Sequence, residues 1–234
     1  MRKQMSDSLL VGGVLAIVGG FLEANTFLCR EMVFANCQTG NLVLLGVYLA
    51  QGEWLEVLRY LAPVLAFVIG IIIIEWTRRR IRYGLWGLHW RQMILLIEAV
   101  GLFLAALVPL GKYNVVATTL IAFVCSLQVD AFRKVNGNPY ATTMCTGNLR
   151  SALIQMFVYK YENNPQAGEK AGHYFRIIGW FMVGAALGGF MTQWFQGKAI
   201  FFCCAVLLLA FFLMFRRTQV YLRWQHIQKV KNQK

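Results

Sequence analysis

The residues best suited to chemistry form two copies of a short polar motif inside apolar sequence. Thr39-Gly40-Asn41-Leu42 recurs as Thr146-Gly147-Asn148-Leu149, 107 positions later. Threonine and asparagine offer hydrogen-bond donors and acceptors, and glycine permits a sharp turn. Where an extended segment turns into a helix, each motif would expose unpaired backbone N–H groups carrying partial positive charge. Two such helix ends facing each other would favour an anion or an anionic group.

One acidic residue precedes each motif at the same interval. The offset of 107 residues aligns Glu23 with Asp130 and Ala24 with Ala131. Carboxylates inside the membrane often relay protons or bind cations. Alternatively, each accepts hydrogen bonds from the loop of its own repeat and holds that loop in place. We predict that Glu23 and Asp130 either couple proton movement to transport or anchor the loops. We favour the anchoring role, because irregular backbone at membrane depth needs fixed partners.

Arg150 and Gln38 complete the candidate binding site. Arg150 lies two residues after Asn148, where the first repeat has Val43. A charge at that depth is costly and indicates function; alternatively, the second half-helix begins nearer the cytoplasm and Arg150 lies among the headgroups. The alternative for the motif pair is a tight turn with helix caps. The predicted substrate-binding residues are Gln38, Thr39, Gly40, Asn41, Thr146, Gly147, Asn148 and Arg150.

Two further acids interrupt apolar runs. Glu75 lies beside Trp76 and an arginine cluster beginning at Arg78, which predicts an interfacial ion pair. Glu98 lies one to two turns into its predicted helix, and the sequence gives it no role.

The composition requires a membrane. Of 234 residues, 58% are hydrophobic and 14% are charged, against about 45–50% and about 25% in ordinary globular chains. This excludes a soluble enzyme, a disordered chain and a disulfide scaffold. The formal net charge is +13, but the basic residues abut apolar runs, as cytoplasmic loops of membrane proteins do. No nucleic-acid recognition motif accompanies them, so we predict no nucleic-acid partner.

Catalytic and metal-binding patterns are missing from the sequence. The six cysteines form no C-x-x-C pair, and the three histidines are isolated. No P-loop and no G-x-S-x-G motif occurs. We therefore expect no enzyme activity, no cofactor and no metal, and any transport would be gradient-driven or passive.

Eight apolar runs are candidates for membrane helices, which need about 20 residues each. If all eight span, nine basic residues lie outside and thirteen inside. If the two T-G-N segments instead enter and return, only Arg30, Arg59, Lys112 and Lys198 lie outside, with eighteen inside. The positive-inside rule favours the second arrangement. The runs cover residues 8–29, 32–51, 58–77, 92–110, 113–132, 139–158, 174–195 and 199–215.

The predicted fold is an all-α integral membrane protein with six transmembrane helices and two re-entrant half-helices. Residues 1–234 form one membrane domain, with repeat one at about 8–110 and repeat two at about 113–216. Three spans per repeat make the two halves inverted relative to each other (3+3). From Asn41 to Ala50 a helix would be about 15 Å long, half of a bilayer core. Residues 217–234 form a basic cytoplasmic tail.

The motifs resemble those of a known family. Residues 34–46, which contain the first T-G-N, resemble the first signature of the YoaK family of bacterial membrane proteins, and residues 132–137 with 142–149 match the second. Residues 19–24 also fit, with Glu23 where the family often has Asp. The resemblance covers nearly the whole chain. It implies a multi-pass inner-membrane protein of a kind taken to transport small solutes, with no assigned substrate.

The predicted function is secondary transport of a small solute bound near the membrane midplane between the T-G-N half-helices. The alternative is a channel-like or structural membrane protein in which T-G-N only caps helices. We expect the bacterial cytoplasmic membrane with both termini cytoplasmic, and anionic lipid at the basic tail. Glycines at small-x-x-x-small spacing indicate close helix packing, and they suit a homodimer or internal contacts equally well. They are Gly12, Gly13, Gly19, Gly20, Gly184, Gly188 and Gly189.

Overall fold

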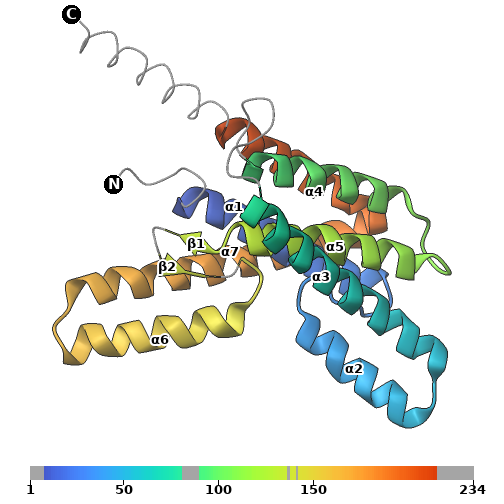
Figure 1. The fold of residues 1–234 in the computed structure, drawn as a ribbon, viewed down its shortest axis with the longest axis horizontal. Coiled ribbons are helices and arrows are strands. Elements are labelled where there is room, and N and C mark those ends of the chain that lie inside the picture. The colour runs from blue at the N-terminus through green and yellow to red at the C-terminus, as the bar shows by residue number, and fades with distance from the viewer. Residues whose placement is uncertain (1–7, 81–89, 136–137, 141, 215–234) are drawn as a thin grey trace, which may run out of the picture.

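The computed structural model describes residues 8–80, 90–135, 138–140 and 142–214, and nearly all of them are helical (Figure 1). Each of the eight apolar runs contains all or most of one helix, and the second and sixth runs also include the loops that precede their helices. One turn of 3-10 helix, η3 (Gln196–Ala199), leads into a helix over residues 200–214. The two-residue strands β1 (Lys134–Val135) and β2 (Asn138–Pro139) pair antiparallel. The labelled helices are α1 (Leu9–Cys29), α2 (Gln38–Gln51), α3 (Trp54–Arg80), α4 (Trp90–Leu107), α5 (Asn114–Ala131), α6 (Cys145–Tyr161) and α7 (Pro165–Phe195).

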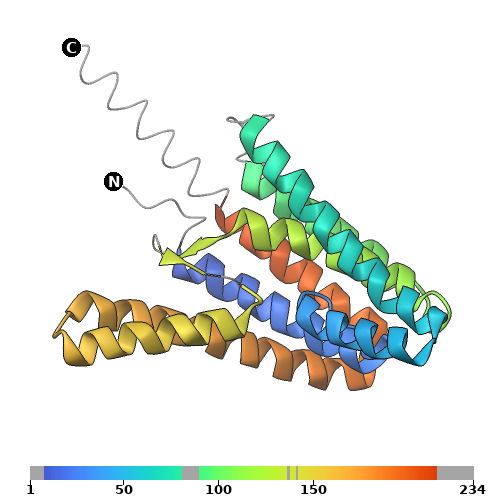
Figure 2. The ribbon, with the colours of Figure 1, turned by 60° about the horizontal axis from the view of Figure 1, so that its bottom comes forward.

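Five helical segments of the described chain are long and apolar enough to cross a membrane. They are α1, α3, α4, α5 and the continuous stretch from Pro165 to Met214. The last segment holds two helices, because the chain reverses direction at η3 (Figure 2). Gln196 absorbs the reversal with a positive φ of 49°. The expected class, an all-α multi-pass membrane protein, is confirmed.

Glycines let α1 pack directly on α7. A side-chain carbon added at Gly20 would meet the backbone carbonyl of Phe181, and one added at Gly184 would meet the backbone of Ile17. Small residues allow this approach because they remove the side chains that separate helix backbones. The predicted close helix packing is confirmed at Gly20, Gly184 and Gly188, which meet the backbone of the other helix.

The long helix of each half packs on the first helix of the other half. The most extensive helix contacts are α1 with α7 and α3 with α5. The short helices α2 and α6 lie instead against their own neighbours, α3 and α7. Each forms a hairpin that extends from the bundle, and the two hairpins lie at opposite ends (Figures 1 and 2).

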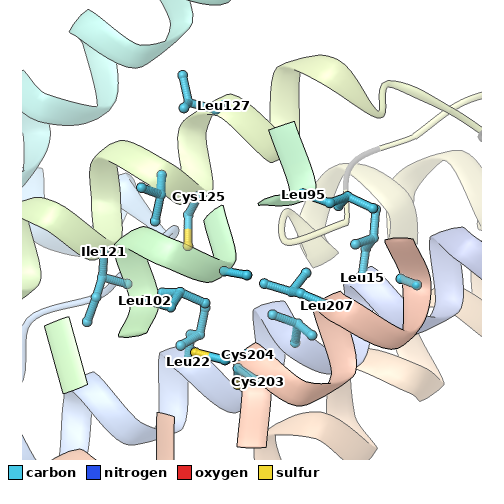
Figure 3. Close-up of a cluster of buried hydrophobic side chains, with 14 of the residues drawn as sticks. Leu15, Leu22, Leu95, Leu102, Ile121, Cys125, Leu127, Cys203, Cys204 and Leu207 are labelled. Atoms are coloured by element: carbon cyan, nitrogen blue, oxygen red, sulfur yellow. The ribbon is translucent and has the colours of Figure 1, made fainter. Parts of the chain in front are cut away.

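The main apolar core lies between α1, α4, α5 and the helix over residues 200–214. Figure 3 shows Leu15 and Leu22 of α1 facing Leu95 and Leu102 of α4, with Cys203 and Leu207 beside them. All six of these side chains are buried. The core therefore joins the beginning of the chain to its end.

The half-helices begin earlier than predicted. The first starts at Gln38 and the second at Cys145, so each T-G-N lies in the first helical turn. The cap positions belong to Cys37 and Met144, and neither makes a side-chain capping bond. The capping role considered for Thr39 and Thr146 is therefore wrong, because the helix has already started before them. With 14 and 17 residues, the helices also exceed the ten-residue estimate. The predicted tail, 217–234, lies outside the described residues.

Candidate functional site

Both loops that lead into the T-G-N helices meet the middle of α1. The carboxylate Oε1 of Glu23 accepts hydrogen bonds from the backbone N–H groups of Asn36 (2.8 Å) and Cys37 (2.6 Å). One turn earlier, the methyl group of Thr143 fills the space beside Gly19 that a larger residue would need. Gly19 is central in α1, so the two loops meet near the midpoint of this helix.

The first loop runs inward from one end of the bundle. Glu31 lies at that end, where its carboxylate pairs with Arg59 at 2.8 Å and its carbonyl accepts from the hydroxyl of Tyr60. Glu31 and Met32 both have left-handed φ angles, 61° and 58°, which turn the chain sharply. Residues 33–37 then run back to the level of Glu23.

Asn41 closes this loop on itself. Its Oδ1 accepts from the backbone N–H of Phe34 (2.9 Å), while its Nδ2 donates to the carbonyl of Phe34 (2.8 Å) and to Gln38 (2.9 Å). These three bonds occupy the amide and fix the approach to α2. Asn148 is also buried, but the residue aligned with Phe34 in the second repeat, Ala141, lies outside the described residues.

The second loop is held by α5 and α7. The backbone N–H of Tyr140 donates to the carbonyl of Arg133, and the hydroxyl of Tyr174 donates to the carbonyl of Pro139 at 2.7 Å. Further along, the hydroxyl of Thr142 lies 3.3 Å from the amide of Gln128. The loop therefore reaches the interior through a fixed path.

A fully buried carboxyl group, Glu98, joins the site from α4. Its exposed fraction is 0%. The amide of Gln128 lies between Glu98 and Thr142: one terminal atom is 3.0 Å and 2.5 Å from the two carboxyl oxygens, and the other faces Thr142. Gln128 thus connects an acid on α4 to the loop before α6.

Several buried polar atoms at this site have no hydrogen-bond partner among the described residues. They are Oε2 of Glu23, both amide atoms of Asn36 and the hydroxyl of Thr143. The Asn36 amide approaches Glu23 and Cys125 without the geometry of a hydrogen bond. Buried polar groups normally have partners in the protein or in bound water. These atoms therefore have hydrogen-bonding capacity left for water or a polar solute.

The thiols of Cys37 and Cys145 also belong to this region. Each precedes its T-G-N motif by one or two residues, and both lie within electrostatic range of Glu23 and of one another. The beginnings of α2 and α6 are therefore neighbours in space, although 107 residues separate their motifs.

Asp130 has different partners from Glu23. It pairs with Arg133 at 3.0 Å and with Arg78 at 3.8 Å. Both arginines also contact Glu75, which confirms the ion pair predicted for that residue. The two aligned acids thus anchor different structures: Glu23 holds a loop, while Asp130 joins the ends of α3 and α5.

Of the remaining predicted binding residues, Gly40 is half-buried beside the ring of Phe34, and the other four face outward. Thr39, Thr146, Gly147 and Arg150 are exposed. Arg150 lies at one end of an open groove of about 550 Å³ along α6, lined mainly by apolar side chains. The structure brings Gln38 and Asn41 together and places Arg150 apart from the buried cluster.

Arg30 is a buried cation that sequence reasoning counted only as a loop charge. Its exposed fraction is 0%. Its guanidinium donates to the amide oxygen of Asn114 (3.1 Å) and to backbone carbonyls at the end of α4, those of Ala105, Val108 and Pro109 (3.0–3.3 Å). It therefore ties the end of α1 to the turn between α4 and α5.

The sequence could have indicated only part of this site. Glu98 was visible as a charge within an apolar run, which marks function inside membranes. Asn36 and Gln128 carry no spacing signal, because their partners are distant in sequence. Within the described residues, no group of three or more His, Cys, Asp or Glu side chains is placed to hold a metal ion.

Comparisons with known proteins agree with the membrane architecture. A family model described as "Protein of unknown function (DUF1275)" matches residues 11–213. The UPF0700 transmembrane protein YoaK of Bacillus subtilis (strain 168) is 26% identical over 146 residues, which cover 60% of this chain and 63% of that protein. The match thus spans less than two thirds of this relative. No solved structure matches the chain.

Proposed function

The chain belongs to the DUF1275 family of proteins of unknown function, as its resemblance to YoaK predicted, and we propose that it is a secondary transporter of a small solute. The observation that carries this proposal is the meeting of two loop–helix junctions at the middle of α1. Glu23 holds the first junction, and Gly19 accommodates the second. Paired irregular segments beside buried polar groups are the arrangement in which transporters bind solutes.

The topology that fits this role has six spans and two re-entrant hairpins. The spans are α1, α3, α4, α5, α7 and the helix that begins at residue 200. The hairpins are formed by α2 and α6 with the loops before them. The first half is then inverted relative to the second, and both termini lie in the cytoplasm of a bacterial cell. The exchanged contacts of α1 with α7 and of α3 with α5 support this symmetry.

Cysteines placed at the two hairpin tips should react from opposite sides of the membrane. A cysteine at Gln51, beside the turn between α2 and α3, should react with an impermeant thiol reagent in intact cells. A cysteine at Glu162, after α6, should react only in inside-out vesicles. Mass spectrometry of the modified peptides separates these sites from the native thiols. Labelling of both positions from the same side would contradict the inverted arrangement.

The solute should be small, and the helix N-termini favour an anionic one. A thermal-shift panel of chloride, nitrate, sulfate, phosphate, small carboxylates and neutral metabolites tests this in the purified protein. A bound solute should raise the melting temperature, because it binds the folded state alone. The solute that does so should then be accumulated by proteoliposomes.

The Thr143→Val variant shows whether such a solute binds at the buried cluster. The hydroxyl of Thr143 is buried without a partner among the described residues, and valine preserves the side-chain shape, so the unliganded melting temperature should not fall. The solute-induced shift should fall or disappear. If no compound shifts the melting temperature of well-folded wild type, the structural alternative is favoured. The three hydrogen bonds that the Asn41 amide makes within its own loop are consistent with that alternative.

A further inference from the structure

Glu98 lies in apolar surroundings without a cation. It shares the buried face of α4 with Leu95 and Leu102, which Figure 3 shows within the apolar core. The titratable groups that face it are thiols, those of Cys125 on α5 and of Cys203 and Cys204 on the last helix. No described Lys, Arg or His pairs with it. An ionised carboxylate here would lack any charge to offset its desolvation.

The contact between Glu98 and Gln128 can accommodate the proton. One terminal atom of the amide lies 2.5 Å and 3.0 Å from the two carboxyl oxygens. Because no charge offsets the desolvation of an ionised Glu98, the protonated form is favoured, and it donates its O–H to the amide oxygen. The amide nitrogen of Gln128 then donates to Thr142 at 3.3 Å.

The opposite amide orientation suits the opposite charge state. An ionised Glu98 accepts from the amide nitrogen, at 3.0 Å from Oε2, and Gln128 then offers its oxygen to Thr142. The hydroxyl of Thr142 must change from acceptor to donor. Each protonation state of Glu98 therefore fixes one orientation of Gln128 and one hydrogen-bonding role of Thr142.

We propose that Glu98 is the proton-binding group of this protein and that Gln128 transmits its protonation state to the loop before α6. On deprotonation, the proton passes from the Glu98 carboxyl to water, the amide of Gln128 rotates by half a turn, and Thr142 reverses its hydrogen bond. Thr142 adjoins Thr143, which packs against Gly19. The acid on α4 thereby acts on the place where the two loops meet.

Glu98 differs from the other two buried acids, Glu23 and Asp130, in its partners. Glu23 accepts two backbone N–H bonds, and Asp130 pairs with two arginines, so each has polar or charged partners of a kind that Glu98 lacks. Glu98 has one neutral amide, which serves either state. The coupling of proton movement to solute movement rests on the proposed transport function, whereas the protonation of Glu98 does not.

Infrared spectroscopy of the purified full-length protein tests the proton directly. At about pH 6, within the range where buried carboxyl groups hold their protons, the wild-type protein should show the C=O stretch of a protonated carboxyl group. The Glu98→Gln variant should lose the part of this band that belongs to Glu98, so the difference spectrum between wild type and variant should contain it, and the amide should preserve the fold because it imitates the neutral acid. Glu53→Gln, at an exposed residue, should retain the band. A band that is absent from wild type, or that is equally intense in wild type and Glu98→Gln, would overturn the proposal.

Hydrogen exchange tests transmission to the loop. At about pH 6, amides of residues 142–148 should exchange at similar rates in wild type and Glu98→Gln. At a pH high enough to remove the infrared band of Glu98, they should exchange roughly threefold faster or more in wild type than in the variant, because only wild type has lost the proton. Gln128→Leu should remove this pH-dependent difference while keeping the infrared band. If wild type and Glu98→Gln exchange these amides at equal rates at both pH values, the protonation state of Glu98 is not transmitted to the loop. Neither measurement needs a solute, so a failed solute screen would leave both results intact.

Discussion

Replacing Arg30 by alanine is expected to lower the free energy of unfolding by about 3–5 kcal/mol, from the cavity and the unpaired carbonyls that it leaves. The side chain is fully buried and donates to four oxygens. Three are backbone carbonyls at the end of α4, where a helix leaves carbonyls without their usual N–H partners; that of Ala105 also accepts from the N–H of Val108. For a chain of this size, the melting temperature in detergent should fall by roughly 10 °C.

Arg59→Ala is the matched control for this measurement. Arg59 lies near the same end of the bundle, but 27% of its side chain is exposed, and its partners are the carboxylates of Glu31 and Glu56. Ion pairs of this kind contribute about 0–1 kcal/mol. Arg30→Lys should fall between the two, because an ammonium group cannot reach four oxygens with a planar fork. Equal melting of the Arg30→Ala and Arg59→Ala variants would show that Arg30 does not hold α4.

Replacing Glu23 by leucine should cost about 2–5 kcal/mol, because two buried N–H groups lose their acceptor. These groups belong to Asn36 and Cys37, immediately before α2. Residues 34–41 should then exchange their amide hydrogens faster, and any solute-induced thermal shift should disappear with the order of this loop.

Glu23→Gln separates anchoring from charge. The glutamine keeps one oxygen in the place of Oε1, so it should retain most of the stability and the protection of residues 34–41. If Glu23→Gln exchanges as fast as Glu23→Leu, the carboxylate charge rather than the hydrogen-bond acceptor holds the loop.

The sequence predicted the helices better than the site. Leu9–Cys29 and Asn114–Ala131 match their apolar runs almost to the residue, because the apolar stretch and the helix end together. At α7 the helix begins at Pro165, nine residues before the apolar run at 174, because its first turns are polar and still helical. The loop over residues 31–37 could not be predicted, because most of its residues are apolar and therefore look like part of the helix that follows.

Within the site, repetition revealed the T-G-N helices and the acid Glu23, which does anchor its own loop. It could not reveal that the amide of Asn41 is hydrogen-bonded to the backbone of Phe34, since that contact depends on the loop conformation. Asp130 shows where repetition misleads: the aligned acid meets arginines from two segments. Glu98 lies outside both motifs, and only the packing of α4 against α5 brings it to Gln128.

Because α1 packs on α7 and α3 packs on α5, each half of the chain needs the other half before its helices can pack. The glycine face of α1 fits the backbone of α7, yet more than a hundred residues must be synthesised between the two helices. At about 5–20 residues per second, the first helix waits on the order of ten seconds or more before its partner emerges. Until then its closest-fitting surface faces lipid or the translocation machinery. Neither half can complete its own interior, so the protein packs late, after α7 and the helix over residues 200–214 have been made.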